Sequence, residues 1–400
     1  MRRAGVAFDR GRRDAREASV ALPAARHLLF SRAMPLPSLD HLAWSKVHPA
    51  RHEANLADSG IEPPDLAAMG LPDRGGLPRE GYDLQPDVEA LFGARWRAPG
   101  GRVLLASGGS EAIALVFGAL LQRGDEVLVE RPGYEPHREV PRLFDVAVRR
   151  FDRPMSPDGP SLVEAIEQAL GPATRMVALT HPHNPSGAAL TAEEARALDG
   201  LAERRGLWLF CDEAYRDVIG GPTGTLASMG PRWVATSSLT KVYGLGGLRI
   251  GWVAGAPDVL ARCAVVQNAL SVTPALPSIA LTLALAPHLD VLRSRALRML
   301  AANRARWSAL VAAGVPFAIP CVSQGTTVWA LFPGAGQGDA FAEMASRRFG
   351  LAVTPGRFFA EPRGIRVALA AEPERFAAAL ETFERALAAF AAEAPVRENP

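Results

Sequence analysis

Cysteine is scarce in this sequence of 400 residues. The three cysteines, Cys211, Cys263 and Cys321, lie far apart and show neither metal-binding nor redox spacing. This argues against zinc, haem and disulfide-built proteins, and an odd, scattered set is typical of a reducing compartment. We therefore expect a cytoplasmic protein without a metal site.

The chain also lacks a long hydrophobic run and an excess of charge of either sign. Its most apolar stretch, 275–289, is interrupted by Pro277, Ser278 and Pro287, which favours a buried helix over a membrane span. Lys and Arg number 44 against 42 Asp and Glu, and this near balance argues against binding to a nucleic-acid backbone. We expect neither nucleic acid nor a membrane as a partner.

The N-terminal segment is rich in arginine. Residues 1–33 hold eight arginines and three acidic residues, including the pairs Arg2-Arg3 and Arg12-Arg13. A twin-arginine export signal requires a continuous apolar stretch next, and residues 19–30 (SVALPAARHLLF) form a poor one. We expect 1–33 to be a disordered tail, the alternative being a gene start placed too early, before Met34.

The rest of the chain is rich enough in apolar residues to form a large core. Hydrophobic residues make up 48% and charged residues 22% of the sequence. Two helices are marked by capping boxes, Ser161 with Glu164 and Thr191 with Glu194. Buried strands are expected at 102–106, 126–130, 176–180, 207–211, 234–238 and 250–254. This alternation predicts an α/β fold with a mostly parallel, helix-covered sheet.

The pattern changes after about residue 287, where we expect a smaller α+β domain. A long helical stretch reaches Ala313, and a final helix is expected at 373–393. Short strands are expected between these helices, at 327–332, 351–353 and 365–369. We expect residues 34–70 to join this small domain in space, which leaves a large domain of 71–287 and a small domain of 288–400.

Residues that can bind ligands follow several expected strands, and ligands bind at the carboxyl ends of strands in such sheets. Ser107-Gly108-Gly109-Ser110 precedes a helix whose N-terminus can hold an anion; it lacks the GxGxxG pattern, and a plain turn is the alternative. Asn184-Pro185-Ser186-Gly187 is, taken alone, typical of a turn. Asp212 ends a buried run, where a carboxylate needs a partner, although it could also cap a helix.

The most informative stretch is residues 237–251, SSLTKVYGLGGLRIG. Lys241 follows a buried strand, lies among hydroxyls and glycines, and precedes Arg249 by eight residues. A lysine removed from water acts as a nucleophile toward carbonyl groups, whereas most lysines are solvated surface charges. Its place at the end of a strand favours the nucleophile.

Taken in order, the segments NPSG, DEAY and SLTKVYGLGGLRIG resemble the PLP-dependent class I/II aminotransferases of fold type I, the aspartate aminotransferase superfamily. The resemblance covers about residues 50–395 and implies pyridoxal 5′-phosphate (PLP) as the cofactor. Lys241 would form the Schiff base with PLP and later carry a proton between the substrate and the cofactor. Asp212 would pair with the pyridine nitrogen, and Asn184 and Tyr215 would hydrogen-bond the phenolic oxygen.

The resemblance also implies the remaining contacts. Tyr134, in ERPGYEPH, would stack on the cofactor ring. The phosphate would be held by Gly109, Ser110, Ser238 and Arg249.

The substrate contacts follow from the same resemblance. Arg366, in GIRVALA, would clamp the substrate α-carboxylate, with Asn184 beside it and Gly60, in NLADSGI, nearby. Many members place a tyrosine before a glycine such as Gly81, where it reaches the partner's phosphate. Residues 71–76 hold no tyrosine, so that contact has no counterpart here, although we still expect a homodimer.

The expected function is amino transfer between an α-amino acid and a 2-oxo acid, within amino acid metabolism. The Arg366 clamp disfavours decarboxylation. A β/γ-lyase, a racemase or a cyclising synthase of the same fold is the alternative. A non-catalytic effector domain of a transcription regulator is more remote, because the first 60 residues show no helix-turn-helix pattern.

The substrate side chain is not identified by the sequence. A second arginine for dicarboxylates is missing from the family position, which favours neutral or apolar amino acids. His52, His137, His183 and Trp329 are further candidates for lining the pocket, and a purely structural role is the alternative for each.

Overall fold

The computed structural model describes residues 41, 44, 54–57, 59–62, 64–70, 84–156, 159–219 and 224–393. These residues belong to one compact unit, residues 37–400. The expected tail 1–33, the segment 71–76 and His52 lie outside the described residues.

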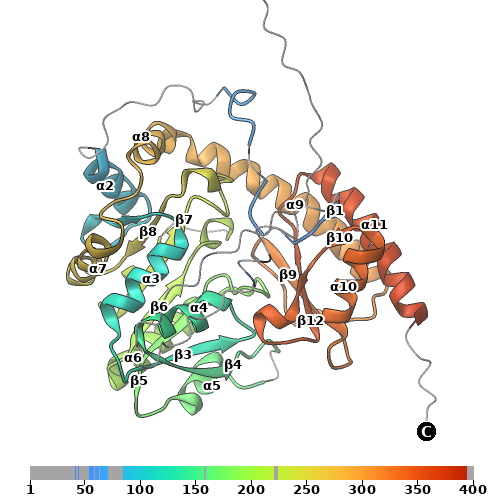
Figure 1. Ribbon diagram of the computed structural model, residues 1–400, viewed down its shortest axis with the longest axis horizontal. Helices are drawn as coiled ribbons and strands as arrows, with labels where there is room; N and C mark the ends of the chain where they lie inside the picture. The colour runs from blue at the N-terminus through green and yellow to red at the C-terminus, as the bar shows by residue number, and fades with distance from the viewer. Residues whose placement is uncertain are drawn as a thin grey trace, which may run out of the picture. The chain divides into compact units, whose positions relative to one another are not determined.

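A seven-stranded sheet, called the large sheet below, organises the first part of the described chain (Figure 1). Its spatial order is β2-β8-β7-β6-β5-β3-β4. The strands from β7 to β4 run parallel, whereas β8 is antiparallel to both β7 and β2. The strands are β2 Leu104–Ala106, β3 Glu126–Arg131, β4 Ala147–Asp152, β5 Thr174–Thr180, β6 Trp208–Asp212, β7 Trp233–Ser238 and β8 Gly251–Ala254.

The expected α/β fold with a mostly parallel sheet is confirmed. Six of the strands match the apolar runs singled out in the sequence, with small shifts at their ends. Strand β4 was not expected, because Phe151 is its only buried residue and the strand therefore carries no apolar run. It lies at one edge of the large sheet.

Helices cover both faces of the large sheet, and its strands other than β4 are apolar on both faces for that reason. In β3, Val127 and Val129 belong to the core cluster that includes α3 and α7, whereas Leu128 belongs to the cluster on α5 and α6. Strand β5 alternates in the same way. The helices of this part are α2 Gln85–Arg95, α3 Gly109–Leu120, α4 Glu135–Glu139, α5 Leu162–Ala169, α6 Ala192–Arg205, α7 Pro257–Leu270 and α8 Leu276–Leu285.

Both capping boxes form as the sequence predicts. The Ser161 hydroxyl accepts a hydrogen bond from the Glu164 backbone N–H at the start of α5, and the Glu164 carboxylate accepts one from the Ser161 backbone N–H. Thr191 and Glu194 do the same at the start of α6. These reciprocal bonds satisfy N–H groups that a helix start otherwise leaves without partners.

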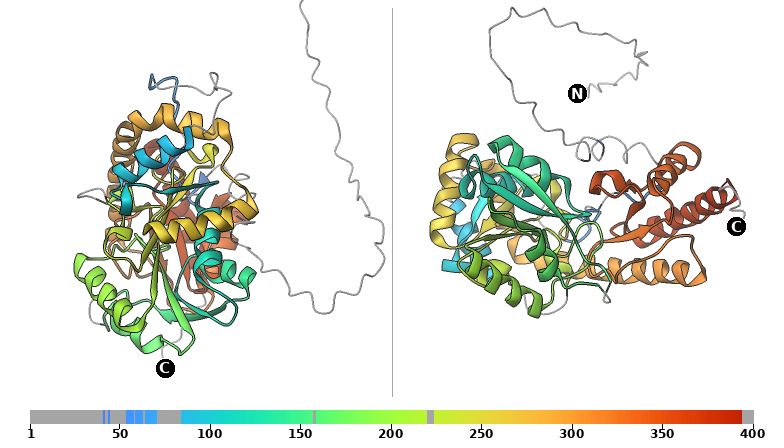
Figure 2. Two further views of the ribbon diagram at one scale, coloured as in Figure 1. Left: turned by 90° about the vertical axis from the view of Figure 1, so that its left-hand side faces the viewer. Right: turned by 90° about the horizontal axis from the view of Figure 1, so that it is seen from below.

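A second, three-stranded sheet of the described residues has the order β11-β12-β9 and is antiparallel. Its strands lie with α10 and α11 beside the large-sheet layer, on the right in Figure 1 and at one end in the right panel of Figure 2. The elements are α9 Leu289–Ala313, β9 Thr327–Leu331, α10 Gln337–Phe349, β10 Leu351–Ala352, β11 Thr354–Pro355, β12 Gly364–Ala368 and α11 Pro373–Glu393.

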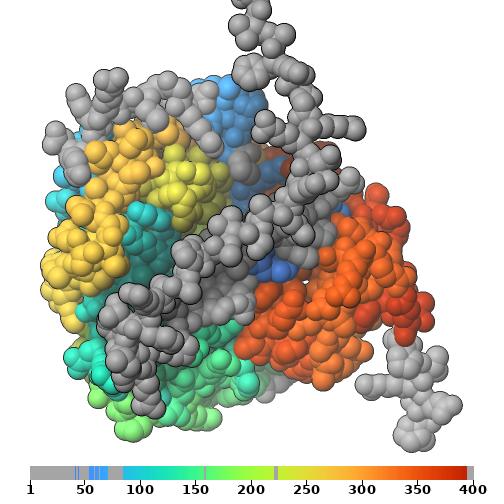
Figure 3. All heavy atoms as spheres, viewed as in Figure 1, coloured from blue at the N-terminus to red at the C-terminus, as the bar shows by residue number. Residues whose placement is uncertain are grey.

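The N-terminal residues reach this second part of the fold. Strand β1, Ala54–Asn55, pairs in parallel with β10. In the space-filling view, the orange-to-red residues after α9 adjoin the green residues of the large-sheet layer (Figure 3). One apolar cluster also contains residues from both parts, so the division into domains at residues 71 and 288 stays a prediction.

No helix among the described residues combines the length and the apolar character that a membrane-spanning helix requires.

Glu213, directly after β6, is a buried carboxyl group that fixes the segment before Trp233. It accepts hydrogen bonds from the Thr225 hydroxyl at 2.7 Å and from the Leu226 backbone N–H at 2.6 Å. Burial raises its pKa from an ordinary 4.5 to about 7. The protonated form is therefore favoured in the folded state, and the stability that it contributes is lost as the pH rises from about 4.5 through 7.

Replacing Glu213 by Gln should remove this pH dependence, because an amide keeps the contacts without a charge. At pH 8 we expect the variant to be more stable than the wild type by roughly 1 to 3 kcal/mol, with little difference at pH 4.5. Denaturant unfolding at both pH values measures this, with the exposed Glu203→Gln as control. Equal stabilities at pH 8 would show that the fold does not raise the pKa of Glu213.

Candidate active site

The pairing of β8 brings three segments to one edge of the large sheet. Gly251, the first residue of β8, lies opposite Ala106 at the end of β2 and opposite Ser238 at the end of β7. The residues before Gly251 therefore meet those that follow the two parallel strands. A Cβ atom on Gly251 would lie 2.5 Å from the Gly108 carbonyl carbon, so this meeting requires glycine.

A cavity of about 630 Å³ opens at this edge. Most of the predicted site residues line it. They come from the carboxyl ends of β2, β3, β5, β6 and β7 with the turns that follow, from the segment before β8, and from β12 of the second sheet. Gly60 is not among the lining residues, although its neighbour Ser59 is. The lining residues are His41, Ala57, Ser59, Gly109, Ser110, Ile113, Tyr134, Asn184, Asp212, Ala214, Tyr215, Ser238, Thr240, Lys241, Arg249 and Arg366.

One end of the cavity is built to hold an anion. Helix α3 starts at Gly109 without a side-chain cap, so its first N–H groups remain available. A Cβ atom on Gly108 would come within 2.3 Å of the Arg249 guanidinium, which only glycine allows to lie so close. Arg249 itself adopts a left-handed φ of 54°, a conformation that costs energy for a residue with a side chain. With the hydroxyls of Ser110 and Ser238, these groups match a phosphate.

Lys241 lines the cavity. Its Nζ donates to the Ser59 hydroxyl at 3.3 Å, and the Tyr215 hydroxyl donates to the same oxygen at 3.0 Å. The Lys241 carbonyl accepts from the Ile61 N–H at 2.8 Å. Ser59 thus joins the amine and the phenol in one network.

The loop that carries Lys241 is tied to the core two residues later. The Tyr243 hydroxyl donates to the buried Asp217 carboxylate at 2.5 Å. The same carboxylate accepts from the Trp96 ring N–H at 2.9 and 3.1 Å. Removing Asp217 would leave two buried donors without an acceptor, so this acid holds the lysine loop in place.

Asp212 ends β6 with its carboxylate in the cavity wall. One oxygen accepts from the Ala214 N–H at 3.0 Å, and the other lies 3.8 Å from the His137 Nε2. A carboxylate in this position can pair with a protonated ring nitrogen of a ligand. Burial, followed by the nearby Asp212 carboxylate, raises the pKa of Tyr134 above its usual range, so Tyr134 stays a neutral phenol.

Arg366 projects from β12 to the same cavity. Its guanidinium donates to the Asn184 side-chain oxygen at 2.9 Å, the Ala57 carbonyl at 3.1 Å and the Thr354 hydroxyl at 3.2 Å. It also lies over the Phe359 ring, 5.1 Å from the centroid. These contacts hold a planar cation in one orientation, which suits a carboxylate.

The other residues that the sequence suggested for the pocket, His137, His183 and Trp329, do not line this cavity. His183 contacts the Ser186 hydroxyl at 2.7 Å and the Pro132 carbonyl at 2.9 Å, and burial lowers its pKa to about 4. Trp329 packs edge-on against Phe359, with centroids 5.4 Å apart. His137 lies beside Asp212. All three fit the structural alternative.

Six lining residues were not among the site residues predicted from the sequence: His41, Ala57, Ser59, Ile113, Ala214 and Thr240. Ser59 carries a weak signal, because it directly precedes Gly60 in NLADSGI. His41 carries none, because its segment lies 94 residues before Glu135, the residue that binds its backbone N–H.

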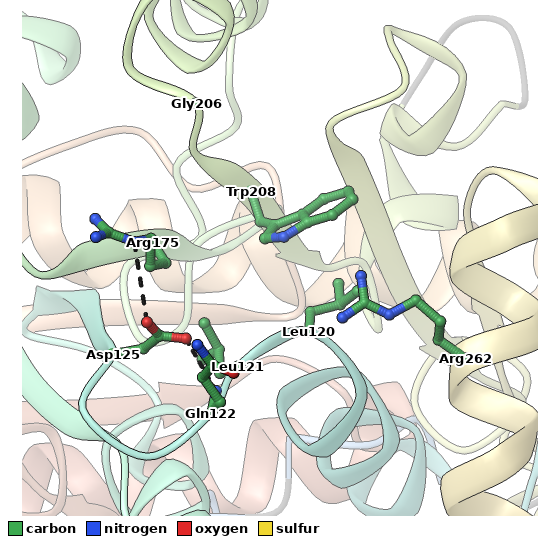
Figure 4. Close-up of a pocket in the computed structure, with 8 residues that line it drawn as sticks. All are labelled: Leu120, Leu121, Gln122, Asp125, Arg175, Gly206, Trp208 and Arg262. Atoms are coloured by element: carbon green, nitrogen blue, oxygen red, sulfur yellow. Dashed lines mark hydrogen bonds and ion pairs between the residues drawn. The ribbon is translucent and has the colours of Figure 1, made fainter.

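A smaller cavity, of about 250 Å³, opens at the opposite, amino ends of β5 and β6. Figure 4 shows Arg175 paired with Asp125 on one side of the Trp208 ring and Arg262 on the other. The Arg175–Asp125 distance is 3.9 Å. Because ligands of such sheets bind at the carboxyl ends, the larger cavity is the candidate active site.

The comparisons with known proteins agree with this assignment. The family model described as "Aminotransferase class I and II" matches residues 82–383. A probable N-succinyldiaminopimelate aminotransferase of Mycobacterium tuberculosis is 29% identical over 51% of the chain and 50% of its own length. Capreomycidine synthase of Streptomyces vinaceus is 29% identical over 70% of the chain and 73% of its own length. The chain spans about half the length of the first of these curated relatives.

A solved structure adds evidence for the fold. A PLP-dependent aminotransferase from Streptococcus suis has a TM-score of 0.79 at 20% identity, over 89% of the chain and 99% of its own. At this identity the likeness concerns the fold alone. The family match covers most of the chain, and the lysine loop, the anion-binding turn and the arginine of β12 meet in one cavity. The chain therefore belongs to the class I and II aminotransferase family.

Proposed function

We propose that the protein moves an amino group between an α-amino acid and a 2-oxo acid, with PLP as its cofactor. The observation that carries this proposal is one cavity lined by an amine, a carboxylate and an arginine held for a carboxylate: Lys241, Asp212 and Arg366. Bound PLP supplies an aldehyde that condenses with amines and a ring that accepts electrons from a substrate carbon.

The lining residues are suited to hold this cofactor. Gly109, Ser110, Ser238 and Arg249 would bind its phosphate at the start of α3. Asp212 would keep the ring nitrogen protonated, and Tyr134 would cover the ring. Asn184 and Tyr215 would bind its phenolic oxygen.

Lys241 has two roles in this proposal. Its Nζ would bind the cofactor aldehyde, and as a free amine it would carry a proton from the substrate Cα to the cofactor carbon that had held the aldehyde oxygen. The sequence contains only two lysines, Lys46 and Lys241, against many arginines. Arginine cannot take over these roles, because its guanidinium stays protonated.

Arg366 and Gly60 would select the substrate class. A guanidinium fixed by Asn184, Ala57 and Thr354 can take the α-carboxylate with two parallel hydrogen bonds. The clamp orients the Cα–H bond for removal and retains the carboxylate, which disfavours decarboxylation. Gly60, beside Ser59, would leave room near that carboxylate.

We further propose a homodimer in the cytoplasm. Three apolar side chains on α7 and just after it are exposed: Val265 by 71%, Leu270 by 62% and Val272 by 59%. A second copy of the chain would cover them, and the scarce, unpaired cysteines suit a reducing compartment.

A cyclising synthase is the second candidate. Capreomycidine synthase matches over 73% of its own length, a larger share than the aminotransferase named above. Both activities would use the same lysine and the same carboxylate clamp, so product analysis must separate them.

The role of Lys241 can be tested through its covalent link to the cofactor. Borohydride reduction of the PLP-loaded protein should fix the cofactor onto Lys241, as peptide mass spectrometry can determine. Lys241→Ala should abolish this link and lower turnover ~10³-fold or more. Lys46→Ala is the matched control and should retain the adduct. An adduct on Lys46 in the wild type would contradict the assignment.

The role of Arg366 can be tested by comparing substrates with and without a carboxylate. Arg366→Lys keeps the charge but loses the bidentate geometry, so kcat/KM for amino acids and for 2-oxo acids should fall together. The fall should correspond to a loss of roughly 2 to 4 kcal/mol of transition-state stabilisation. Amines without a carboxylate should be nearly unaffected. The exposed Arg363→Lys, three residues earlier, is the control. An unchanged ratio of amino-acid to amine turnover would mean that Arg366 only braces β12.

A further inference from the structure

His41 is a lining residue of the active-site cavity that the proposed chemistry does not use. Its side chain is almost fully buried, with 4% exposed, and it shares the cavity with Lys241 and Arg366. Its backbone N–H donates to the Glu135 carboxylate at 2.6 Å. This bond anchors the residue through its main chain and leaves the ring to face the cavity.

Both ring nitrogens of His41 lack a hydrogen-bond partner among the described residues. Burying a polar atom without a partner costs free energy, and buried polar groups in proteins are therefore almost always paired. An unpaired ring in the wall of a cavity is satisfied when a ligand supplies the missing partner.

The surroundings of His41 are aromatic. Its ring centroid lies 5.4 Å from that of Phe358, 5.5 Å from Phe359, 6.2 Å from Tyr134 and 6.5 Å from Trp44. A ligand group that reaches the imidazole therefore passes along flat, largely apolar surfaces.

The charge of His41 is set by the same surroundings. Burial and the positive charges of Arg366, Lys241 and Arg138 lower its pKa to about 2. The neutral ring is therefore favoured at neutral pH, and it offers one donor and one acceptor. Arg138 pairs with Glu135 at 3.0 Å and Glu139 at 3.2 Å, so it is already engaged.

We propose that His41 is a specificity-determining residue, which hydrogen-bonds an uncharged polar group at the end of a long, apolar or aromatic amino-acid side chain. The inference rests on the proposed function, because it places the α-carboxylate at Arg366. A carboxylate side chain is disfavoured, because it would give up its hydration beside a neutral ring and an engaged arginine. The substrate class is the uncharged, polar-tipped amino acids, of which tyrosine and glutamine are examples.

The test uses α-methyl amino acids, which lack the Cα–H bond and bind without being turned over. The dissociation constants of α-methyltyrosine and α-methylphenylalanine for the PLP-loaded enzyme are measured by calorimetry. The second pair is α-methylglutamine and α-methylmethionine. In at least one pair, the wild type should bind the polar member about tenfold more tightly, the value of one buried hydrogen bond.

His41→Phe keeps an aromatic ring in the cluster and removes both nitrogens, so this preference should fall to near one. His41→Gln offers an amide donor and acceptor and should retain part of it. His288→Leu, a histidine outside the cavity lining, should leave the preference as in the wild type. Melting temperatures of all variants show whether they fold. If His41→Phe does not fold, the partial loss of preference expected for His41→Gln is the test.

Three results would overturn the inference. One is a wild type without preference in either pair. Another is a preference that survives His41→Phe. The third is an equal loss for both members of a pair, which would mean that His41 contacts the shared α-carboxylate or only braces the wall. If the preference appears and depends on His41 but no amino acid delivers its amino group to the cofactor, then the transaminase proposal fails and this inference stands.

Discussion

One antiparallel strand among parallel neighbours is the constraint on which the active site depends. Strand β8 lies between β2 and β7 with Gly251 opposite the last residues of both. The turn after β2, the end of β7 and the segment before β8 must therefore share a small volume. Gly108 and Gly251 permit this approach, because a side chain at either position would collide with the neighbouring segment.

The same edge brings charged groups of opposite sign together in a largely buried site. Asp212 and Lys241 follow adjacent parallel strands, and Arg366 comes from β12 of the second sheet. The arginine is oriented by Asn184, which follows β5, and by the Ala57 carbonyl near β1. The proposed carboxylate clamp is thus assembled from three distant parts of the chain, and under this proposal substrate binding depends on the packing of β1 and β12.

Much of this arrangement could be predicted from the sequence, because its chemistry lies in short contiguous segments. Lys241 and Arg249 share one loop, and Asp212 and Tyr215 lie three residues apart. The buried strands were found because both of their faces are apolar, and β4 was missed because only Phe151 is buried there. Ser59 and His41 were missed for a different reason. Their roles arise from contacts with residues 94 to 182 positions away, which no local pattern records.

The most direct test of the account is the half-reaction of the PLP-loaded enzyme with single amino acids and no acceptor. The account predicts that at least one α-amino acid converts the cofactor absorbance to that of the pyridoxamine form. One equivalent of the matching 2-oxo acid should appear, and adding a 2-oxo acid should restore the original spectrum. Consumption of the amino acid with the cofactor spectrum unchanged at the end would contradict amino transfer and favour a lyase, a racemase or a cyclising synthase. A spectrum that no amino acid perturbs would contradict an enzymatic role for the cavity.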